Sequence, residues 1–460
     1  MGNLYNMKMK KISLFLLLGL CCYIPTFGAA PDDLLPSAGL YSSQLSTQQA
    51  APSPIKPFFQ ELKTKLSLED CIRIALANSP AAVSAELAVQ EAHINLNLAR
   101  AEFLPTVTAH ASQTYMVNKP HGYHTSEHGG SDVYAQAQLS LSAVSEKIRA
   151  IKIQKLALEQ AELALSSQTN EITRSVKKAY YALLSAKRAV AIRTASRDLY
   201  QDQYERAAEY FRLGLRPKVD VTTAEVNLNN EKLKLIRATN LVKTASASLA
   251  NTMGVTTPNV LEIEDMEDFE PFTIPFDEAV QIAYTNRPDV LSSQAGLKIS
   301  QIQVNQAKAG LFPTFSFGAV YGKYGDDFYI KDDETRLTAS VEFPIFNAFK
   351  SYNRVKQAKV NLDKAQNASK SLVNNVFLEV QNAYIKMQEA QESIPIAELN
   401  VEKAKENLDL SRGRYNEGIG DSIELKDAEV AYTDAELNLL TARYDYAAAV
   451  ADVKQAMGTY

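Results

Sequence analysis

The chain has 460 residues and a formal net charge of -5, and 46% of its residues are hydrophobic while 22% are charged. This composition can bury a core, which excludes a compositionally disordered chain. The mild acidity argues against a nucleic-acid partner, because binding to a phosphate backbone needs clustered basic charge. The counts of glycine and proline, 18 and 17, are low for a chain of this length. Because these residues interrupt secondary structure, low counts favour long uninterrupted helices or strands.

Residues 1–30 have the pattern of a secretory signal peptide. Three lysines precede an apolar stretch that begins at Ile12 and ends at Leu20, and small residues follow before residue 31. Two alternatives stay open. One is an N-terminal membrane anchor, for which the apolar stretch is short. The other is a lipid attached at Cys21 or Cys22.

Beyond residue 30 the sequence predicts an exported chain without a membrane-spanning helix. No apolar run there approaches the ~18 residues that such a helix needs, so entry into a membrane would require β-strands. Removal of the signal would leave Cys71 as the only cysteine, and no intrachain disulfide is expected. Residues 31–66, rich in Pro, Ser and Gln, are expected to form an extended N-terminal segment.

The rest of the chain is an internal duplication. Residues 67–106 align without a gap with residues 275–314, and after the first hairpin a second constant offset aligns Ala224–Val226 with Ala428–Val430. The expected domains are therefore repeat 1 at 67–254, a linker or equatorial segment at 255–274, and repeat 2 at 275–460.

Each repeat carries the pattern of a very long helix. In repeat 2, apolar residues from Val376 to Leu408 recur in alternating steps of four and three. A period of about 3.5 residues is typical of helices packed lengthwise by knobs-into-holes. At about 1.5 Å per residue, each long helix would span roughly 100 Å. The expected helices are 68–101 with a break before Pro80, 144–212, 218–253, 347–416 with a kink at Pro395, and 422–457.

Two hairpins are predicted, at 106–142 and 314–343, because their residues alternate between apolar and polar. In the first, Ala137 and Leu139 flank Gln138. Such alternation over about ten residues is typical of outer membrane barrel strands, although hairpins packed on a soluble core also fit it. Four strands cannot close a barrel, since about eight are needed. Membrane strands would therefore require several chains to share one barrel, and three chains would supply twelve strands.

Several motifs recur in register in the two repeats. They are Phe211-Arg212-Leu213-Gly214 followed by Asp220 and Ala224-Glu225, Tyr415-Asn416-Glu417-Gly418 followed by Glu424-Leu425-Lys426-Asp427-Ala428-Glu429, and the closing Met253-Gly254 and Met457-Gly458 pairs. Together with the duplicated order of elements, they resemble the TolC-type outer membrane efflux channel family over residues 67–458. The resemblance implies a mainly α fold with membrane β, in which a long α-helical barrel of coiled-coil packed helices is continuous with a β-barrel shared by a trimer.

The resemblance also implies a function and a location. The chain would be a passive outer membrane exit duct, with a large periplasmic part, of a tripartite efflux or type I secretion system. The implied partners are a homotrimer of the chain itself, a periplasmic adaptor protein, an inner-membrane pump or ABC exporter, and outer membrane lipid. No enzyme activity and no cofactor is expected, because nucleotide-binding, zinc-protease and hydrolase motifs are missing from the sequence. The alternative is a soluble periplasmic coiled-coil scaffold protein.

Candidate gate residues follow the helical turns at Gly214 and Gly418. These turns lie at the far end of the long helices from the strands, so they would form the periplasmic tip, and the resemblance makes this tip the adaptor-docking end. Glu424 and Asp427 are three residues apart at the start of the last helix and therefore share one face. In a trimer they would form a carboxylate ring that concentrates cations.

The resemblance assigns further residues to this periplasmic gate. It places Glu424 and Asp427 at the acidic aperture. It also implies that Tyr415 is an aromatic residue that helps to hold the closed state. Repeat 1 supplies two more gate residues, Asp220 and Arg216. The chain departs from the family at Gly420, where a basic residue often joins the closing network. A second interpretation of Glu424 stays open, because Asp421-Ser422-Ile423-Glu424 also reads as a capping box.

Three histidines, His121, His124 and His128, lie between two predicted strands. Their spacing fits imidazole ligands of a metal, but the length difference between the repeats also falls in this stretch. Solvated loop histidines are the favoured interpretation, and no metal is expected. The abundant carboxylates of the long helices have lysines three or four residues away, which predicts solvated helix faces.

Overall fold

The computed structural model describes residues 65–115, 129–140, 144–257, 259–266, 271–326, 332–417 and 419–460. They all belong to one unit, Phe58–Tyr460. The predicted signal peptide, nearly all of the N-terminal segment, the three loop histidines and Gly418 lie outside the described residues. None of the helices in the described ranges is both long enough and apolar enough to cross a membrane.

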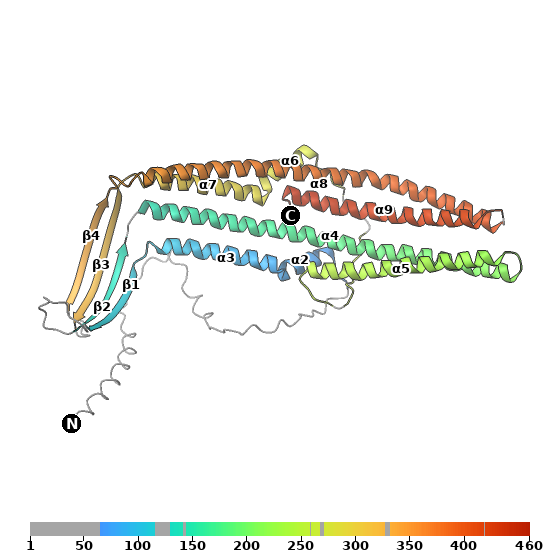
Figure 1. The fold of residues 1–460 in the computed structure, drawn as a ribbon, viewed down its shortest axis with the longest axis horizontal. Coiled ribbons are helices and arrows are strands. Elements are labelled where there is room, and N and C mark those ends of the chain that lie inside the picture. Colours follow the sequence, from blue (N-terminus) through green and yellow to red (C-terminus); the bar gives the residue numbers. More distant parts are fainter. Residues whose placement is uncertain are drawn as a thin grey trace, which may run out of the picture. The chain divides into compact units, whose positions relative to one another are not determined.

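The described unit runs twice through the same order of elements (Figure 1). The first half contains α2 (Leu68–Asn78), α3 (Pro80–Ala101), β1 (Thr106–Tyr115), β2 (Gly129–Ser140), α4 (Val144–Arg212) and α5 (Lys218–Thr252). The second contains α6 (Phe276–Asn286), α7 (Pro288–Ala309), β3 (Thr314–Asp326), β4 (Asp332–Glu342), α8 (Lys350–Asn416) and α9 (Ser422–Met457). The two predicted long helices are confirmed, with 69 residues in α4 and 67 in α8.

Local sequence signals set the ends of several helices. Ser67 caps α2, since its hydroxyl accepts a hydrogen bond from the Asp70 amide at 3.1 Å. Pro80 opens α3 at a position where no amide donor is needed. Gly214 follows α4 with a φ of 72°, the left-handed conformation expected of a glycine after a helix. α8 continues through Pro395, and the kink predicted there stays a prediction.

The helices pack lengthwise around α4 and α8. α4 contacts α5 and α9 along its C-terminal part and α3 and α7 toward the sheet, while α8 contacts α9, α7 and α6. The residues of the predicted stripe on α8 are buried, among them Val376, Val380 and Met387. The helices therefore follow the order α3–α4–α7–α8 near the sheet and α5–α4–α9–α8 near the turns.

The four strands form one antiparallel sheet in the order β1-β2-β3-β4. Its register pairs Val107 with Ala137, Ala137 with Tyr321, and Phe315 with Val341. Residues directly opposite each other share a face, so the apolar sets of the four strands gather on one face, as the alternation predicts. Val341 is 63% exposed on that face. The unit thus leaves an apolar sheet face uncovered.

Two described parts of the segment predicted as a linker, residues 255–257 and 259–266, pack into the core next to α2 and α4. Ile263 is buried and forms a parallel bridge with Leu66. The buried Tyr180 hydroxyl of α4 donates a hydrogen bond to the carbonyl oxygen of Glu264 at 2.7 Å. This segment therefore closes the core of the first half rather than only connecting the halves.

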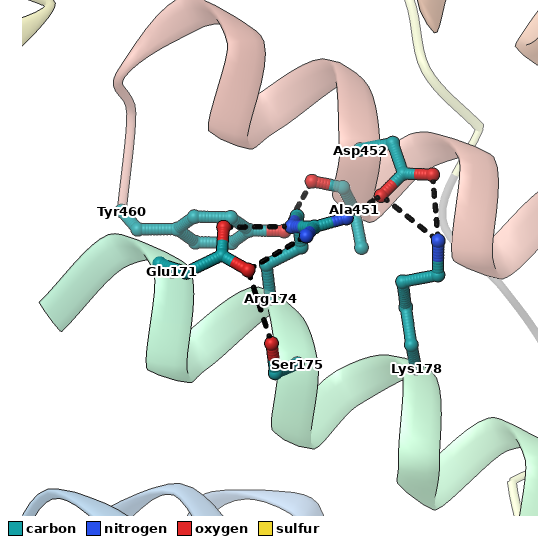
Figure 2. A network of polar contacts seen from close by, with 7 residues as sticks. All are labelled: Glu171, Arg174, Ser175, Lys178, Ala451, Asp452 and Tyr460. Carbon is teal, nitrogen blue, oxygen red and sulfur yellow. Dashed lines mark hydrogen bonds and ion pairs between the residues drawn. The ribbon is translucent and has the colours of Figure 1, made fainter. Parts of the chain in front are cut away.

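An ion-pair network joins the two halves where α4 meets α9 (Figure 2). Arg174 Nη1 lies 2.9 Å from Asp452 Oδ1, and Lys178 Nζ lies 3.0 Å from Asp452 Oδ2. Arg174 also pairs with Glu171 at 2.6 Å. These groups are partly buried, so salt screens their attraction less than that of fully exposed pairs. The network thus adds polar contacts to the apolar packing of α9 on α4.

Gly254 is expected to be essential for the stability of the first half. Its φ is 68°, and a Cβ there would lie 2.8 Å from the backbone oxygen of Asn78. Gly254→Ala should therefore lower the free energy of unfolding by about 1–3 kcal/mol, seen as a lower melting temperature by circular dichroism. Gly310→Ala is the matched control, because Gly310 has a φ of -67° and its Cβ would meet no atom closer than 3.5 Å. Equal losses in both variants would contradict this account.

Candidate functional site

Three of the five residues predicted to form the gate, Tyr415, Glu424 and Asp427, flank the turn between α8 and α9. Asp421 caps α9, because its Oδ1 accepts a hydrogen bond from the Ile423 amide at 3.3 Å. Behind the turn, a small apolar cluster joins the two helices and consists of Leu408, Leu425 and Ala428, with Tyr415 and Tyr432 packed against it. This cluster packs the end of α8 against the start of α9 and so positions the polar side chains of the turn.

Arg216 connects the turn of the first half to that of the second. Its Nη1 lies 3.8 Å from Asp220 Oδ2, and its guanidinium carbon lies 5.6 Å from the centre of the Tyr415 ring. Burial raises the pKa of the Tyr415 hydroxyl, while the positive charge of Arg216 opposes that rise. Three of the five predicted gate residues are therefore in one group of contacts, with a neutral phenol against a cation.

Glu424 pairs with a residue that the sequence analysis did not single out. Its Oε1 lies 3.4 Å from Arg414 Nε, and both side chains are exposed. Of the predicted capping box, the Asp421 half forms, whereas Glu424 makes no hydrogen bond to the Asp421 amide among those of the described residues. Asp427 is exposed on the same helix and belongs to neither ion pair.

Gly420 is required by the shape of the turn. The amides of Ile419 and Gly420 both donate hydrogen bonds to the Arg414 carbonyl oxygen, at 3.0 and 2.9 Å. A Cβ at position 420 would lie 2.9 Å from the Tyr415 nitrogen, so a basic side chain there would collide with the backbone. Arg414, on the preceding helix, places a cation beside Glu424 instead.

The prediction that the carboxylates lie on solvated faces is wrong for two residues near this site. Glu231 on α5 is buried and pairs with Arg193 at 3.1 Å and Lys234 at 3.0 Å. Glu429 on α9 is 1% exposed; its Oε1 accepts a hydrogen bond from Gln203 Nε2 on α4. The other oxygen, Oε2, has no hydrogen-bond partner among the described residues. Burial raises the pKa of Glu429 to about 7.

No group of three or more His, Cys, Asp or Glu side chains in the described ranges could hold a metal ion. The arrangement at the turns consists instead of ion pairs, one cation–aromatic contact and exposed carboxylates. Such an arrangement can attract and release ions and can hold two helical turns together. His121, His124 and His128, for which the sequence favours solvated loop side chains, lie outside the described residues.

Comparison with known proteins gives consistent matches. The model of the outer membrane efflux protein family matches residues 71–255 and 279–459. The chain is similar to outer membrane protein TolC of Escherichia coli strain K12, with 22% identity over 385 residues, which cover 79% of this chain and 76% of that protein. It is also similar to the antibiotic efflux pump outer membrane protein ArpC of Pseudomonas putida, with 22% identity over 447 residues, or 93% of this chain and 88% of that protein.

The fold is also that of solved outer membrane channels. The crystal structure of the CmeC outer membrane channel of Campylobacter jejuni matches with a TM-score of 0.76 at 18% identity, over 85% of each chain. The family resemblance and the fold class expected from the sequence are confirmed: mainly helical, with a four-stranded sheet, as in channels that combine a helical barrel with a β-barrel part. The matched family is one of channels and not of enzymes.

The buried Glu429 predicts a pH dependence of stability. Its ordinary pKa is 4.5 and its pKa in the folded chain is about 7, so in this window the folded chain holds a proton that the unfolded chain releases. Its contribution to stability is therefore complete below about pH 4.5 and is lost as the pH rises through 7. Glu429→Gln should raise the melting temperature at about pH 8 and leave it nearly unchanged at about pH 4.

The control for this prediction is Glu402→Gln, since Glu402 is exposed on α8. That variant should change the melting temperature little at either pH. If Glu429→Gln instead lowers the melting temperature more at about pH 8 than at about pH 4, the carboxylate is charged and stabilising in the folded chain.

Proposed function

The chain belongs to the outer membrane efflux protein family, and we propose that three copies of it close into one duct fed by a periplasmic adaptor and an inner-membrane pump or ABC exporter. It is an outer membrane channel of the class that serves efflux and type I secretion systems. One observation carries this proposal. In the sheet and in the helical part alike, the first half of the chain supplies one unpaired edge and the second half supplies the other.

The open edges are those of both the sheet and the helices. β1 and β4 are the edge strands. Among the described elements, α3 and α5 pack mainly on α4, with α3 also touching α2, and α8 is the last helix on the other side. β1, α3 and α5 come from the first half, whereas β4 and α8 come from the second. One edge of a copy can therefore pair with the opposite edge of the next, and such contacts close into a ring.

Exposed apolar residues at heptad spacing support this pairing. On α5 they are Val219, Val226 and Leu233, and on α8 they are Leu378, Ile385 and Leu399. Apolar stripes of this kind are typical of helices that pack lengthwise on a partner helix. Open strand edges are not tolerated in lipid, so β1 and β4 also need partners. The number three comes from the family resemblance and gives twelve strands, a number that closes a barrel.

The helical turns would be the closed periplasmic entrance of this duct. In a ring of three, Glu424 and Asp427 would each recur three times around the axis, beside the group formed by Arg216, Asp220 and Tyr415. Exposed carboxylates in a narrow mouth concentrate cations. The exposed Arg414–Glu424 pair is weak, about 0–1 kcal/mol, so contact with an adaptor could open it. Gly214 and Gly418 would mark the docking end.

The membrane face of the sheet can be tested with two neighbouring residues. Val341 lies on the apolar face of β4, and Ser340 lies at the same depth on the other face. If this face meets lipid, Val341→Arg should be costly, by up to about 2–4 kcal/mol at the bilayer midplane and less toward the end of the strand, and should reduce the amount of trimer in outer membrane fractions. Ser340→Arg should assemble nearly as well as the unchanged chain. A soluble trimer or monomer without detergent would favour the scaffold alternative.

The gate can be tested in planar bilayers with Glu424→Gln combined with Asp427→Asn. We expect weaker cation selectivity and the loss of block by a trivalent cation added on the periplasmic side, because the carboxylate ring is removed. Asp421→Ala is the control, since it removes the helix cap, at a cost of about 1 kcal/mol, but leaves both gate carboxylates. Unchanged block in the double variant, with only a lower melting temperature, would leave the residues a purely structural role.

A further inference from the structure

We propose that the segment between β4 and the first turns of α8, residues 343–357, binds an anionic phospholipid of the periplasmic leaflet of the outer membrane. In this site the exposed apolar side chains contact the acyl chains, and Lys350 and Arg354 contact the phosphate. Figure 1 shows this segment where the sheet meets the helices. The inference rests on the proposed outer membrane duct and goes beyond it, because it assigns a ligand to named residues.

The first observation is that the apolar face of the sheet continues past the end of β4. Phe343 and Ile345 extend the alternation that ends within the strand at Val341. Ile345 is 90% exposed, and Phe346 and Phe349 after it are 79% and 70% exposed. Soluble surfaces rarely carry apolar side chains gathered in this way. Aromatic residues at the edge of a membrane face are, by contrast, typical of the level of the lipid head groups.

The backbone holds two of these aromatic rings together. Ala348 and Phe349 have left-handed φ values of 51° and 61°, and no other residue with a side chain in the described ranges has a positive φ. Such a conformation is costly for residues other than glycine. The turn brings the ring centres of Phe346 and Phe349 to 6.2 Å, edge to face. The strained turn therefore presents a compact aromatic group at the surface instead of burying it.

The second observation is a positive charge directly beside this aromatic group. Residues 343–362 contain four Lys or Arg side chains and no Asp or Glu. Lys350 and Arg354 are four residues apart, so they share one face of α8, and both line an open groove with Asn347 and Asn353. Within the described part of the chain, neither cationic group has an ion pair or a hydrogen bond. The groove thus offers two cations and two amides to an anion.

An anionic phospholipid matches both observations. Lys and Arg donate charge-assisted hydrogen bonds to phosphate oxygens, and cations next to apolar side chains are typical of sites at anionic membrane surfaces. A free phosphate would account for the cations but not for the exposed aromatic rings. An apolar protein partner would account for the rings but not for the excess of positive charge. The lipid accounts for both, and it lies next to the apolar face that the segment continues.

The cation pair is a feature of the second half of the chain. The constant offset between α4 and α8 aligns Lys350 and Arg354 with Glu146 and Ala150. The start of α4 therefore has a carboxylate and a methyl group at the positions where α8 has its two cations. We expect one tightly bound anionic lipid for each chain.

Native mass spectrometry of the full chain in detergent tests the site. Dioleoyl phosphatidylglycerol is the anionic probe, and dioleoyl phosphatidylcholine is the probe without net charge. The unchanged chain should bind phosphatidylglycerol more tightly than phosphatidylcholine. Lys350→Gln with Arg354→Gln should weaken the binding of phosphatidylglycerol about tenfold or more, because two contacts to a charged phosphate are lost. Inorganic phosphate should not displace the lipid, since it has no acyl chains.

The matched control is Lys364→Gln with Lys370→Gln. These residues are exposed on α8, and their substitution removes the same charge at positions that begin ~20 Å farther along the helix. This variant should keep the preference for phosphatidylglycerol. Equal affinity of the unchanged chain for both lipids would overturn the site.

Two further outcomes separate this site from the proposed assembly. If Lys350→Gln with Arg354→Gln makes the trimer dissociate but leaves the lipid bound, the two cations contact a neighbouring copy, and the lipid site is overturned. If the unchanged chain gives only monomers, the proposed ring fails. The lipid preference measured on those monomers still decides the site, because all of its residues belong to one chain.

A single tryptophan tests the contact with acyl chains, because the chain contains none. Phe346→Trp in phosphatidylglycerol vesicles with brominated acyl chains should lose most of its fluorescence, since bromine quenches tryptophan on contact. Phe211→Trp is the control, because Phe211 is exposed at the other end of α4, and it should keep its fluorescence. Equally weak quenching of both variants would place the aromatic group outside the bilayer and overturn its contact with lipid.

Discussion

Lengthwise packing of the shorter helices on α4 and on α8 is the interaction on which the rest of this structure depends. Each helix is several times longer than a globular core is wide, roughly 100 Å at about 1.5 Å per residue, so the apolar residues cannot gather at one centre. They form separate clusters along the helices, one in each half and a small one at the α8–α9 turn. The helices thereby hold the sheet and the turns apart at their opposite ends, and each end can do different chemistry.

The period of the apolar residues explains why so much of the fold could be predicted. Steps of four and three from Val376 to Leu408 predict a helix packed on other helices, and residues of that stripe are buried. Strict alternation fixes which face of a strand is apolar, and the register of the sheet agrees. The bridge between Leu66 and Ile263 could not be found in this way, because two short segments far apart in the sequence carry no period.

The site illustrates a second limit of sequence reasoning. Burial of Glu429 had a readable signal, since this residue lies four positions from Leu425 and four from Thr433, both of which are buried. A carboxylate in a charged helix is nevertheless read first as solvated. The Arg414–Glu424 pair had no such signal, because it depends on how the chain folds back at Gly420. The backbone of that turn excludes a side chain where the family often has a cation, and a neighbouring helix end places one nearby.

The duplication gives the chain two versions of one helix contact that differ in their chemistry. Inside the chain, α9 is joined to α4 by Arg174, Lys178 and Asp452. At the aligned positions of α8 and α5 the residues are neutral. At these three positions the exposed side chains are Leu378, Asn382 and Ser248, so the ion pairs that join α4 to α9 have no counterpart there. The duplication thus conserves the lengthwise order of the helices while the charges of one contact, desolvated at a cost of several kcal/mol each when left unpaired, are confined to the place where α4 and α9 pair them within the chain.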